Sequence, residues 1–319
     1  MDATTEAGSG VQASGRPPWR LALGRLRHDK VAMAAVTILT LYVVMAAVAP
    51  ILQKTGLIDP YTLHNDLLRP EDGMPAGTLG GVGSHHLFGV EPQTGRDVFA
   101  RIVAGVTQSM LISVCATVFS ITLGTTVGII SGYAGGRVDF VLGRVVDLVL
   151  AFPALLMLLT LSVVLIQRIS ALGVPSGGPA QIVYLILVLG FFGFPFIARV
   201  IRGQVLSLRE REFMQAARAI GVPTRRIWFK ELLPNLWPPL LVFGTLTLPG
   251  NVSAEAALSF LGVGVPPPTP TLGNILADSV SFLQADPVFF ALPGLAIFVF
   301  VLSANLLGDS LRDALDPKS

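Results

Sequence analysis

The feature that most constrains this chain is a series of six long segments without any charged side chain. A helix needs about 20 predominantly apolar residues to cross the hydrocarbon core of a bilayer. In lipid the backbone must satisfy its own hydrogen bonds, which favours helices. We therefore expect an all-α integral membrane protein with about six transmembrane helices. The segments are Val31–Ala49, Met110–Ser131, Leu148–Gln167, Gln181–Ala198, Leu232–Ala254 and Pro287–Gly308.

Composition agrees with a membrane protein and argues against other classes. Of the 319 residues, 52% are hydrophobic and 13% are charged, whereas soluble domains carry about 25% charged residues. The net charge of +2 gives no reason to expect a nucleic-acid partner. The one cysteine, Cys115, excludes an intramolecular disulfide and a cysteine-based metal site. His85 and His86 are adjacent and would point opposite ways on an extended segment, so no metal site is expected.

The distribution of basic residues predicts how the chain crosses the membrane. Of the 22 Lys and Arg residues, 17 fall in segments that are cytoplasmic if the N-terminus is inside, and 5 fall in outer segments. This bias predicts cytoplasmic termini and a multi-pass protein of the cytoplasmic (inner) membrane. Ala47-Val48-Ala49, after a basic region, also resembles a signal-peptide cleavage site. The charge-free core of 19 residues and the following Pro50 favour a retained signal anchor instead.

We expect five regions along the chain: a cytoplasmic tail, a first transmembrane helix, an extracytoplasmic segment, a five-helix core and a second cytoplasmic tail. Their predicted bounds are 1–30, 31–49, 50–106, 107–309 and 310–319, and the core includes a cytoplasmic loop at 199–235. Local kinks or helix ends are expected at Pro153, Pro195, Pro238, Pro239 and Pro249. The uncharged stretch Ala256–Ala277 is predicted to be a loop at a membrane surface, because it contains Pro266, Pro267, Pro268 and Pro270.

The cytoplasmic loop has the pattern of two short helices. Phe213, Ala216, Ala217 and Ile220 recur at i, i+3, i+4 and i+7, which predicts one apolar helical face. Gly221 is expected to end this helix. Thr224 is expected to cap the second helix, and Pro234 to close the unit. Such a hairpin suits insertion into a groove on a partner, and it equally suits a position flat on the bilayer with its arginines on anionic lipid.

This loop resembles a known family motif. The run Glu212–Gly221, followed by Leu233-Pro234-Asn235, is similar to the cytoplasmic "EAA…G…LP" loop of ABC importer permeases. Two positions depart from that pattern: Gln215 replaces an acid, and Glu231 stands where an apolar residue is usual. The resemblance implies a type I ABC importer fold and a loop that docks into a cleft of an ATPase subunit. The residues so implicated are Glu212, Phe213, Gln215, Ala216, Ala217, Arg218, Ile220, Gly221, Leu233 and Pro234.

Other segments resemble the dipeptide/oligopeptide subclass of these permeases, namely Thr94–Val98, Ala254–Gly262 and Asn305–Asp309. The resemblance implies short peptides as cargo, with nickel or another small solute as the alternative. It also implies partners: a second homologous permease in a heterodimer, two ATP-binding subunits and an extracytoplasmic peptide-binding lipoprotein. None of the four lysines follows a glycine, so the chain has no P-loop. We expect no enzyme activity and no cofactor here, with ATP and Mg bound by the partner subunits.

Two further groups of residues have a structural and a functional interpretation. Gly124, Gly128, Gly132 and Gly136 recur every four residues, which favours close helix packing, either within the chain or against the partner permease. Asp147 and Glu255 are the acids nearest the predicted spans. They are candidates for the transport pathway, or for structural hydrogen bonds and anchors at the span ends.

Two rival classes of function fit less well. A proton-coupled secondary transporter would need ionisable residues at mid-span and an inverted repeat, and neither is evident. A membrane enzyme would need a nucleophile–base pair or a metal-ligand cluster on one helix face. Neither class explains the hairpin.

Overall fold

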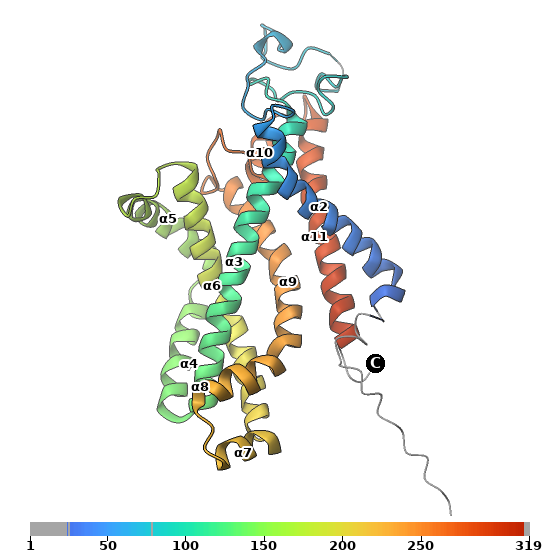
Figure 1. Ribbon diagram of the computed structural model, residues 1–319. Coiled ribbons are helices and arrows are strands. Elements are labelled where there is room, and N and C mark those ends of the chain that lie inside the picture. Colours follow the sequence, from blue (N-terminus) through green and yellow to red (C-terminus); the bar gives the residue numbers. More distant parts are fainter. Residues whose placement is uncertain (1–23, 25, 78, 316–319) are drawn as a thin grey trace, which may run out of the picture.

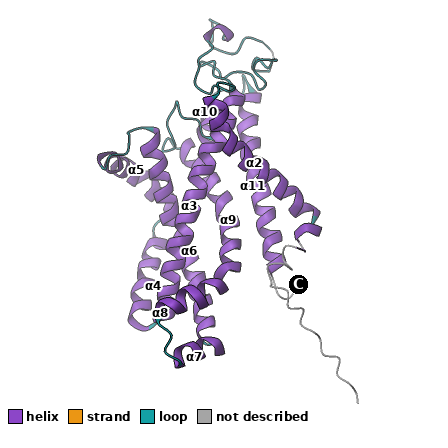
Figure 2. Cartoon of the chain, viewed as in Figure 1, coloured by secondary structure: helices purple, strands orange, loops and turns teal. Residues whose placement is uncertain are grey.

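The structure, a computed structural model, describes residues 24, 26–77 and 79–315. Most of the predicted N-terminal tail and the last residues of the C-terminal tail therefore lie outside the described residues. Within the described part the regular structure is helical, without a named strand (Figure 2). The longer helices are α2 (Lys30–Lys54), α3 (Val98–Ala134), α4 (Gly136–Ala151), α5 (Ala154–Ala171), α6 (Gly178–Arg209), α9 (Leu233–Phe260) and α11 (Pro287–Leu315).

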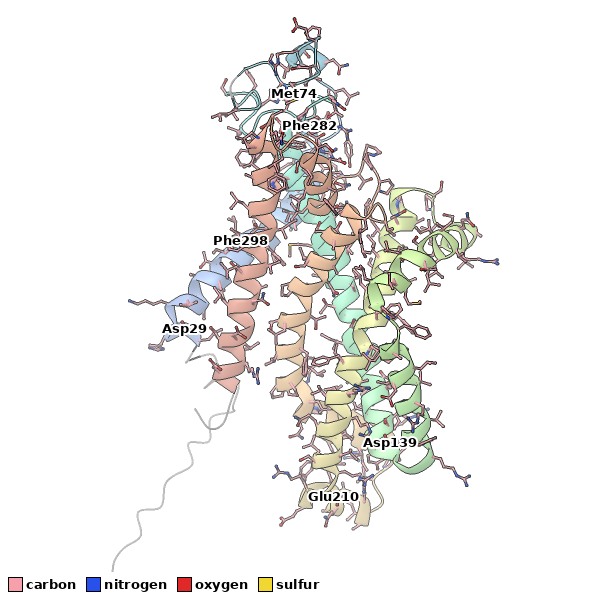
Figure 3. All side chains as sticks on the ribbon, turned by 180° about the vertical axis from the view of Figure 1, so that it is seen from behind. Asp29, Met74, Asp139, Glu210, Phe282 and Phe298 are labelled. Atoms are coloured by element: carbon pink, nitrogen blue, oxygen red, sulfur yellow. The ribbon has the colours of Figure 1, made fainter. Side chains whose placement is uncertain are left out.

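Shorter helices connect these long ones. They are η1 (Asn65–Leu67), α7 (Glu212–Ala219), α8 (Thr224–Arg226), the π-helix η2 (Ile227–Leu232) and α10 (Leu272–Val280). Figure 1 shows α3 and α6 running side by side through the molecule, with α9, α11 and α2 on one flank. Figure 3 places Met74 and Phe282 at one end and Asp139 and Glu210 near the other.

Among the described residues, five helices are long and apolar enough to cross a membrane: α2, α3, α5, α6 and α11. The predicted all-α membrane architecture is thus confirmed. The fifth predicted span, Leu232–Ala254, corresponds to the 28-residue helix α9, which is long enough but less apolar. Three internal prolines, with Asn251 and Glu255 near its end, account for the difference.

The third predicted span, Leu148–Gln167, is not one helix. It begins in the last turn of α4, passes a break at Phe152 and continues in α5, where Pro153 is the N-cap residue. This agrees with the expectation that Pro153 would end a helix, because proline lacks the N–H that continues the ladder. The sequence pattern indicated a connecting segment at 136–151. These residues instead form the helix α4, whose polar side includes Asp139.

The outer segment is shorter than expected. α2 continues through Pro50 to Lys54, and α3 already begins at Val98, because the Asp97 carboxylate accepts a hydrogen bond from the Ala100 N–H at 2.7 Å. The predicted boundary at residue 106 therefore falls inside α3. The predicted loop Ala256–Ala277 is also shorter, since α9 ends at Phe260 and α10 starts at Leu272. The prolines do lie in the non-helical part, 261–271.

Glycines allow the close contact between α3 and α6. A Cβ at Gly124 would lie 2.7 Å from Ile197, one at Gly128 would lie 2.8 Å from the Ala198 carbonyl oxygen, and one at Gly132 would lie 2.9 Å from the Arg202 carbonyl oxygen. These three glycines thus pack within the chain. Gly136 lies outside the contact: it starts α4 with φ +54° and has no neighbour within 4 Å of a built Cβ.

Candidate functional site

A helical hairpin projects from the end of the bundle opposite residues 55–97. α6 ends at Arg209, and α7 follows after a two-residue turn. Gly221 has φ +74° and its N–H donates to the Arg218 carbonyl at 3.0 Å, while Val222 donates to Ala217 at 3.0 Å. A left-handed glycine beyond the last helical residue is a common helix terminator. In Figure 1 this hairpin lies beyond the ends of α2 and α11.

One face of α7 is turned toward the chain's own core. Met214 is 0% exposed and packs with Ile227 and Leu232. Ala217, one turn later, is 8% exposed. Ala217 therefore does not share an outward face with the other predicted apolar residues. Met214 and Ala217 have the i, i+3 spacing of a helical face, and the core around Met214 comes from α3, α6, η2 and α9, which the local pattern did not reveal.

The opposite side of α7 is open. Phe213 and Ile220 are 40% and 79% exposed, and Glu212, Gln215 and Ala216 are exposed as well. Large exposed apolar side chains beside small and polar ones are typical of a contact surface. We call this set, Glu212, Phe213, Gln215, Ala216 and Ile220, the outer face of α7.

The second helix of the hairpin differs from the expectation. Pro223 rather than Thr224 is the N-cap residue of α8, and no side chain caps it. α8 continues through η2 into α9, so 224–260 is one helical run. Pro234 lies in the first turn of α9 and does not close the unit. Its missing N–H coincides with the change from π-helical to α-helical hydrogen bonding at the start of α9.

Aromatic and polar contacts fix the hairpin to the end of α3. The Arg218 guanidinium lies over the Tyr133 ring, 4.9 Å from its centroid, and Tyr133 packs edge-on against Trp228 at 6.2 Å. Gln215 donates to the Glu210 carbonyl at 3.2 Å. The rim is predominantly basic: exposed Arg211, Arg218, Arg225, Arg226 and Lys230 surround the apolar side chains, with acids at Glu210 and Glu212.

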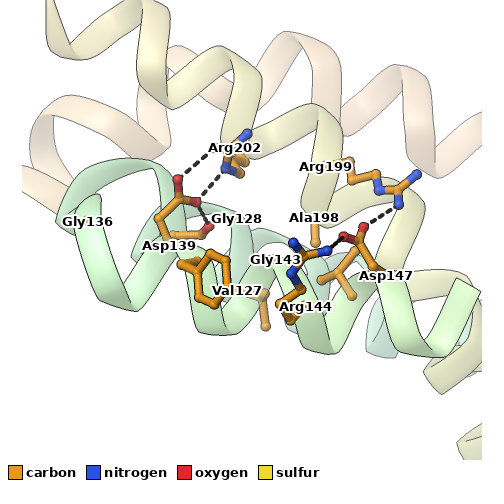
Figure 4. Close-up of a pocket in the computed structure, with 13 residues that line it drawn as sticks. Val127, Gly128, Gly136, Asp139, Gly143, Arg144, Asp147, Ala198, Arg199 and Arg202 are labelled. Carbon is orange, nitrogen blue, oxygen red and sulfur yellow. Dashed lines mark hydrogen bonds and ion pairs between the residues drawn. The ribbon is translucent and has the colours of Figure 1, made fainter.

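Asp147 belongs to a charged groove of about 690 Å³ between α3, α4 and α6 (Figure 4). It pairs with Arg199 at 2.5 Å and approaches Arg144 at 3.9 Å, and its side chain is 49% exposed. This position is that of an exposed ion pair near the end of the bundle.

A second pair in this groove was missed by the sequence reasoning. Arg202 donates to both carboxylate oxygens of Asp139, at 2.5 and 2.6 Å, and the Ser131 hydroxyl also donates to Asp139. These bonds, with that of Arg202 first, lower the Asp139 pKa to about 2. Its sequence signal is only an acid in the first turn of α4 and an arginine 63 residues later, which no local pattern connects.

Glu255 is fully buried near the end of α9. Its carboxylate accepts hydrogen bonds from Ser109 at 3.0 Å, Ser259 at 3.0 Å and Thr271 at 2.8 Å. None of the grooves described in this section includes it. The acid is therefore engaged in a structural hydrogen-bond network.

The adjacent histidines are positioned by different contacts. His86 bonds to Asp97 through Nδ1 at 2.7 Å and stacks near His64, with 5.1 Å between ring centroids. His85 is exposed. Within the described residues no group of three or more His, Cys, Asp or Glu side chains could hold a metal ion.

A second groove, of about 890 Å³, runs along α3, η2 and α9. Apolar and threonine side chains line most of it, among them Val118, Thr125, Trp237 and Leu241. Trp237 and Leu241 are 54% and 48% exposed. This groove is an open face of the chain that the sequence did not indicate, because its walls come from segments far apart.

Comparison with known proteins identifies the class of this fold and site. Residues 124–319 match the family of binding-protein-dependent transport system inner membrane components, and residues 17–70 match the N-terminal transmembrane domain of oligopeptide transport permease C. The first match covers more than half of the chain. The chain belongs to the family of binding-protein-dependent transport system inner membrane components.

Relatives extend the similarity to nearly the full length. The dipeptide transport system permease protein DppC of Alkalihalophilus pseudofirmus is 35% identical over 301 residues, covering 94% of this chain and 90% of the relative. The oligopeptide transport system permease protein OppC of Bacillus subtilis is 34% identical over 300 residues, with the same coverage. A chain of the inward-facing MetNI methionine ABC transporter has a similar fold, with TM-score 0.53, 22% identity, and coverage of 68% of this chain and 97% of that one.

Proposed function

We propose that this chain is one of two non-identical permease subunits of an ATP-driven importer of short peptides. The family assignment and the two permeases of dipeptide and oligopeptide systems support the class and the cargo. The observation that carries the proposal is the hairpin 211–232, whose outer face of α7 exposes Phe213 and Ile220 inside a basic rim.

The hairpin would dock into a cleft of an ATPase subunit. An apolar centre surrounded by arginines fits a groove that is apolar at its base and acidic at its edge. The hairpin's position beyond the ends of α2 and α11 supports this interpretation over a helix lying flat on the bilayer (Figure 1). ATP and Mg would be bound by two such partner subunits, and no residue of this chain has a catalytic role.

Movement of the hairpin can reach the membrane through one helical run. Because α8, η2 and α9 are continuous from Thr224 to Phe260, a displacement at the docking surface is passed directly into α9. Segments of π-helix are frequent at functional sites, and η2 lies between the hairpin and the membrane part. Alternating access would follow from reorientation of α9 against α3.

The groove along α3 and α9 is the surface that a second, homologous permease would cover. Its exposed Trp237 and Leu241 match the aromatic and apolar composition of interface cores. Cargo would arrive from an extracytoplasmic peptide-binding lipoprotein on the side of residues 55–97. No observation favours nickel or another solute over peptide.

The docking surface is tested by the Ala216→Asp substitution. Ala216 is exposed on the outer face of α7, so the isolated chain should fold normally. In the docked complex an aspartate would place an unpaired charge in a closed contact, which costs several kcal/mol; each 1.4 kcal/mol is about a tenfold loss of affinity. We expect the variant to reach the membrane but to lose the ATPase subunits on co-purification, and peptide uptake with them.

A matched control is Ala76→Asp, the same change at an exposed alanine of the outer segment, which should retain the ATPases. Ala217 is unsuitable because it is buried within the chain. If the Ala216→Asp complex keeps its ATPases, this surface is not the docking site, and reduced lipid association instead would indicate a helix on the bilayer.

A further inference from the structure

Glu255 receives hydrogen bonds from three separate elements. Ser109 belongs to α3, Ser259 to α9 itself, and Thr271 is the N-cap residue of α10. A Cβ at Gly273 would lie 2.9 Å from Glu255 Oε1, so this approach requires glycine.

Two of these hydroxyls also accept a backbone N–H. The Leu272 N–H donates to Ser109 Oγ at 3.0 Å, and the Asn274 N–H donates to Thr271 Oγ1 at 3.0 Å. Ser109 and Thr271 thus link Glu255 to the first turn of α10. The carboxylate therefore accepts hydrogen bonds from three elements at the N-terminus of α10. Its contacts are those of a side chain that holds neighbouring elements together.

The element held in this way is the proline loop 261–271 with α10. Its other polar attachments are single contacts: Gln181 of α6 donates to the Val263 carbonyl at 3.0 Å, and Arg101 of α3 donates to the Pro268 carbonyl at 3.5 Å. Leu272 and Ile275 of α10 also pack in a core with Val252 of α9. Glu255 lies at one end of the helical run 224–260, and the hairpin lies at the other. Glu255 is therefore the polar link between that run and the N-terminus of α10, beside these apolar contacts.

We propose that Glu255 is a positioning residue that makes the proline loop and α10 move together with α9 during transport. The proposal rests on the proposed function, because it needs the hairpin to be displaced by ATPases. It assigns to Glu255 the coupling between that displacement and closure of the extracytoplasmic end.

Glu255→Gln tests this role, since the amide replaces one acceptor oxygen of the network with a donor group. A buried hydrogen-bonding group left without a partner is costly enough to shift the docked loop toward release by roughly tenfold or more. We expect the complex to assemble with its ATPases, to hydrolyse ATP faster without peptide, and to take up at least about tenfold less peptide per ATP. Ser259→Ala, which removes one donor and leaves the cap of α10 intact, should give a smaller change in the same direction. Glu71→Gln, at an exposed carboxylate, is the matched control.

Hydrogen exchange of the amides at 272–275 in the purified chain supplies a readout that does not need the partners. Faster exchange in Glu255→Gln, with uncoupled hydrolysis, would support the proposal. If hydrolysis and uptake fall in parallel, Glu255 is merely structural and the proposal fails; unchanged exchange and an unchanged ratio overturn it as well. Should Glu255→Gln not fold, Ser259→Ala carries the same test. A wild-type complex without ATPases would instead refute the proposed function, while the exchange result still stands.

Discussion

At the scale of single residues, two aspartate–arginine pairs differ in how much they can contribute. Asp139 is bonded by both an arginine and a serine, and its side chain is 19% exposed. Asp147 and its partner Arg199 are 49% and 56% exposed. Water screens an exposed pair, so its net contribution is small. The Asp139–Arg202 pair therefore contributes more than the Asp147–Arg199 pair to holding α4 against α6.

We predict that Asp139→Asn lowers the unfolding free energy by roughly 1 kcal/mol, and Asp147→Asn by less. The Asp139 pKa is lowered from 3.8 to about 2, so its contribution is complete above pH 3.8 and is lost as the pH falls through about 2. The difference between wild type and Asp139→Asn should thus be constant from neutral pH to about pH 5 and shrink below pH 4. Thermal unfolding of the detergent-solubilised chain measures it. A difference that grows on acidification would contradict the assignment.

At the scale of helices, packing between α3 and α6 depends on backbone approach. A Cβ at Gly128 would meet both the Ala198 carbonyl oxygen and Ile201 at 2.8 Å, and such contacts cannot be relieved by a side-chain rotation. Glycine inside a helix is otherwise unfavourable by about 0.5–1 kcal/mol relative to alanine. The close approach of α6 explains why Gly128 is glycine and not alanine.

Gly128→Ala should accordingly destabilise the chain by about 1–3 kcal/mol through overpacking. Gly143→Ala in α4 is the matched control, because nothing lies within 4 Å of a Cβ at Gly143. It should leave stability unchanged or raise it slightly, since alanine is the better helix former. The two midpoints of thermal unfolding give the comparison, and equal midpoints would show that the α3–α6 contact can relax.

Helix type was predictable from sequence, whereas helix continuity was not. The apolar runs and Pro153 indicated helices and a break correctly, because lipid leaves few alternatives. Pro234 was wrongly expected to close the hairpin. It lies at the start of α9, directly after η2, and the helical run continues through it. The outer face of α7 was only partly predictable: Ile220 and Phe213 are exposed, but Ala217 is buried, as is Met214, whose core neighbours lie in α3, α6, η2 and α9.

At the scale of the whole molecule, the two ends of the bundle differ in character. One end carries the irregular segment 55–97, loop 261–271 and α10, and the other carries α4, α7 and α8 (Figure 1). Hydrogen bonds between distant segments stabilise the first end. Glu255 and Ser109, for example, are 146 residues apart in the sequence. No sequence spacing reveals them, because they depend on how α3, α9 and α10 converge.

Orientation follows from the charge bias and can be measured directly. Since 17 of the 22 Lys and Arg residues belong to predicted cytoplasmic segments, the hairpin end should face the cytoplasm. In a Cys115→Ala background, cysteine replacing the exposed Glu71 should react with an impermeant thiol reagent on intact cells. Cysteine replacing the exposed Thr224 should react only after permeabilisation. Because both sites are exposed, a difference in labelling reports the side of the membrane and not burial. The reverse pattern would place α7 and α8 outside, where no ATPase could reach them.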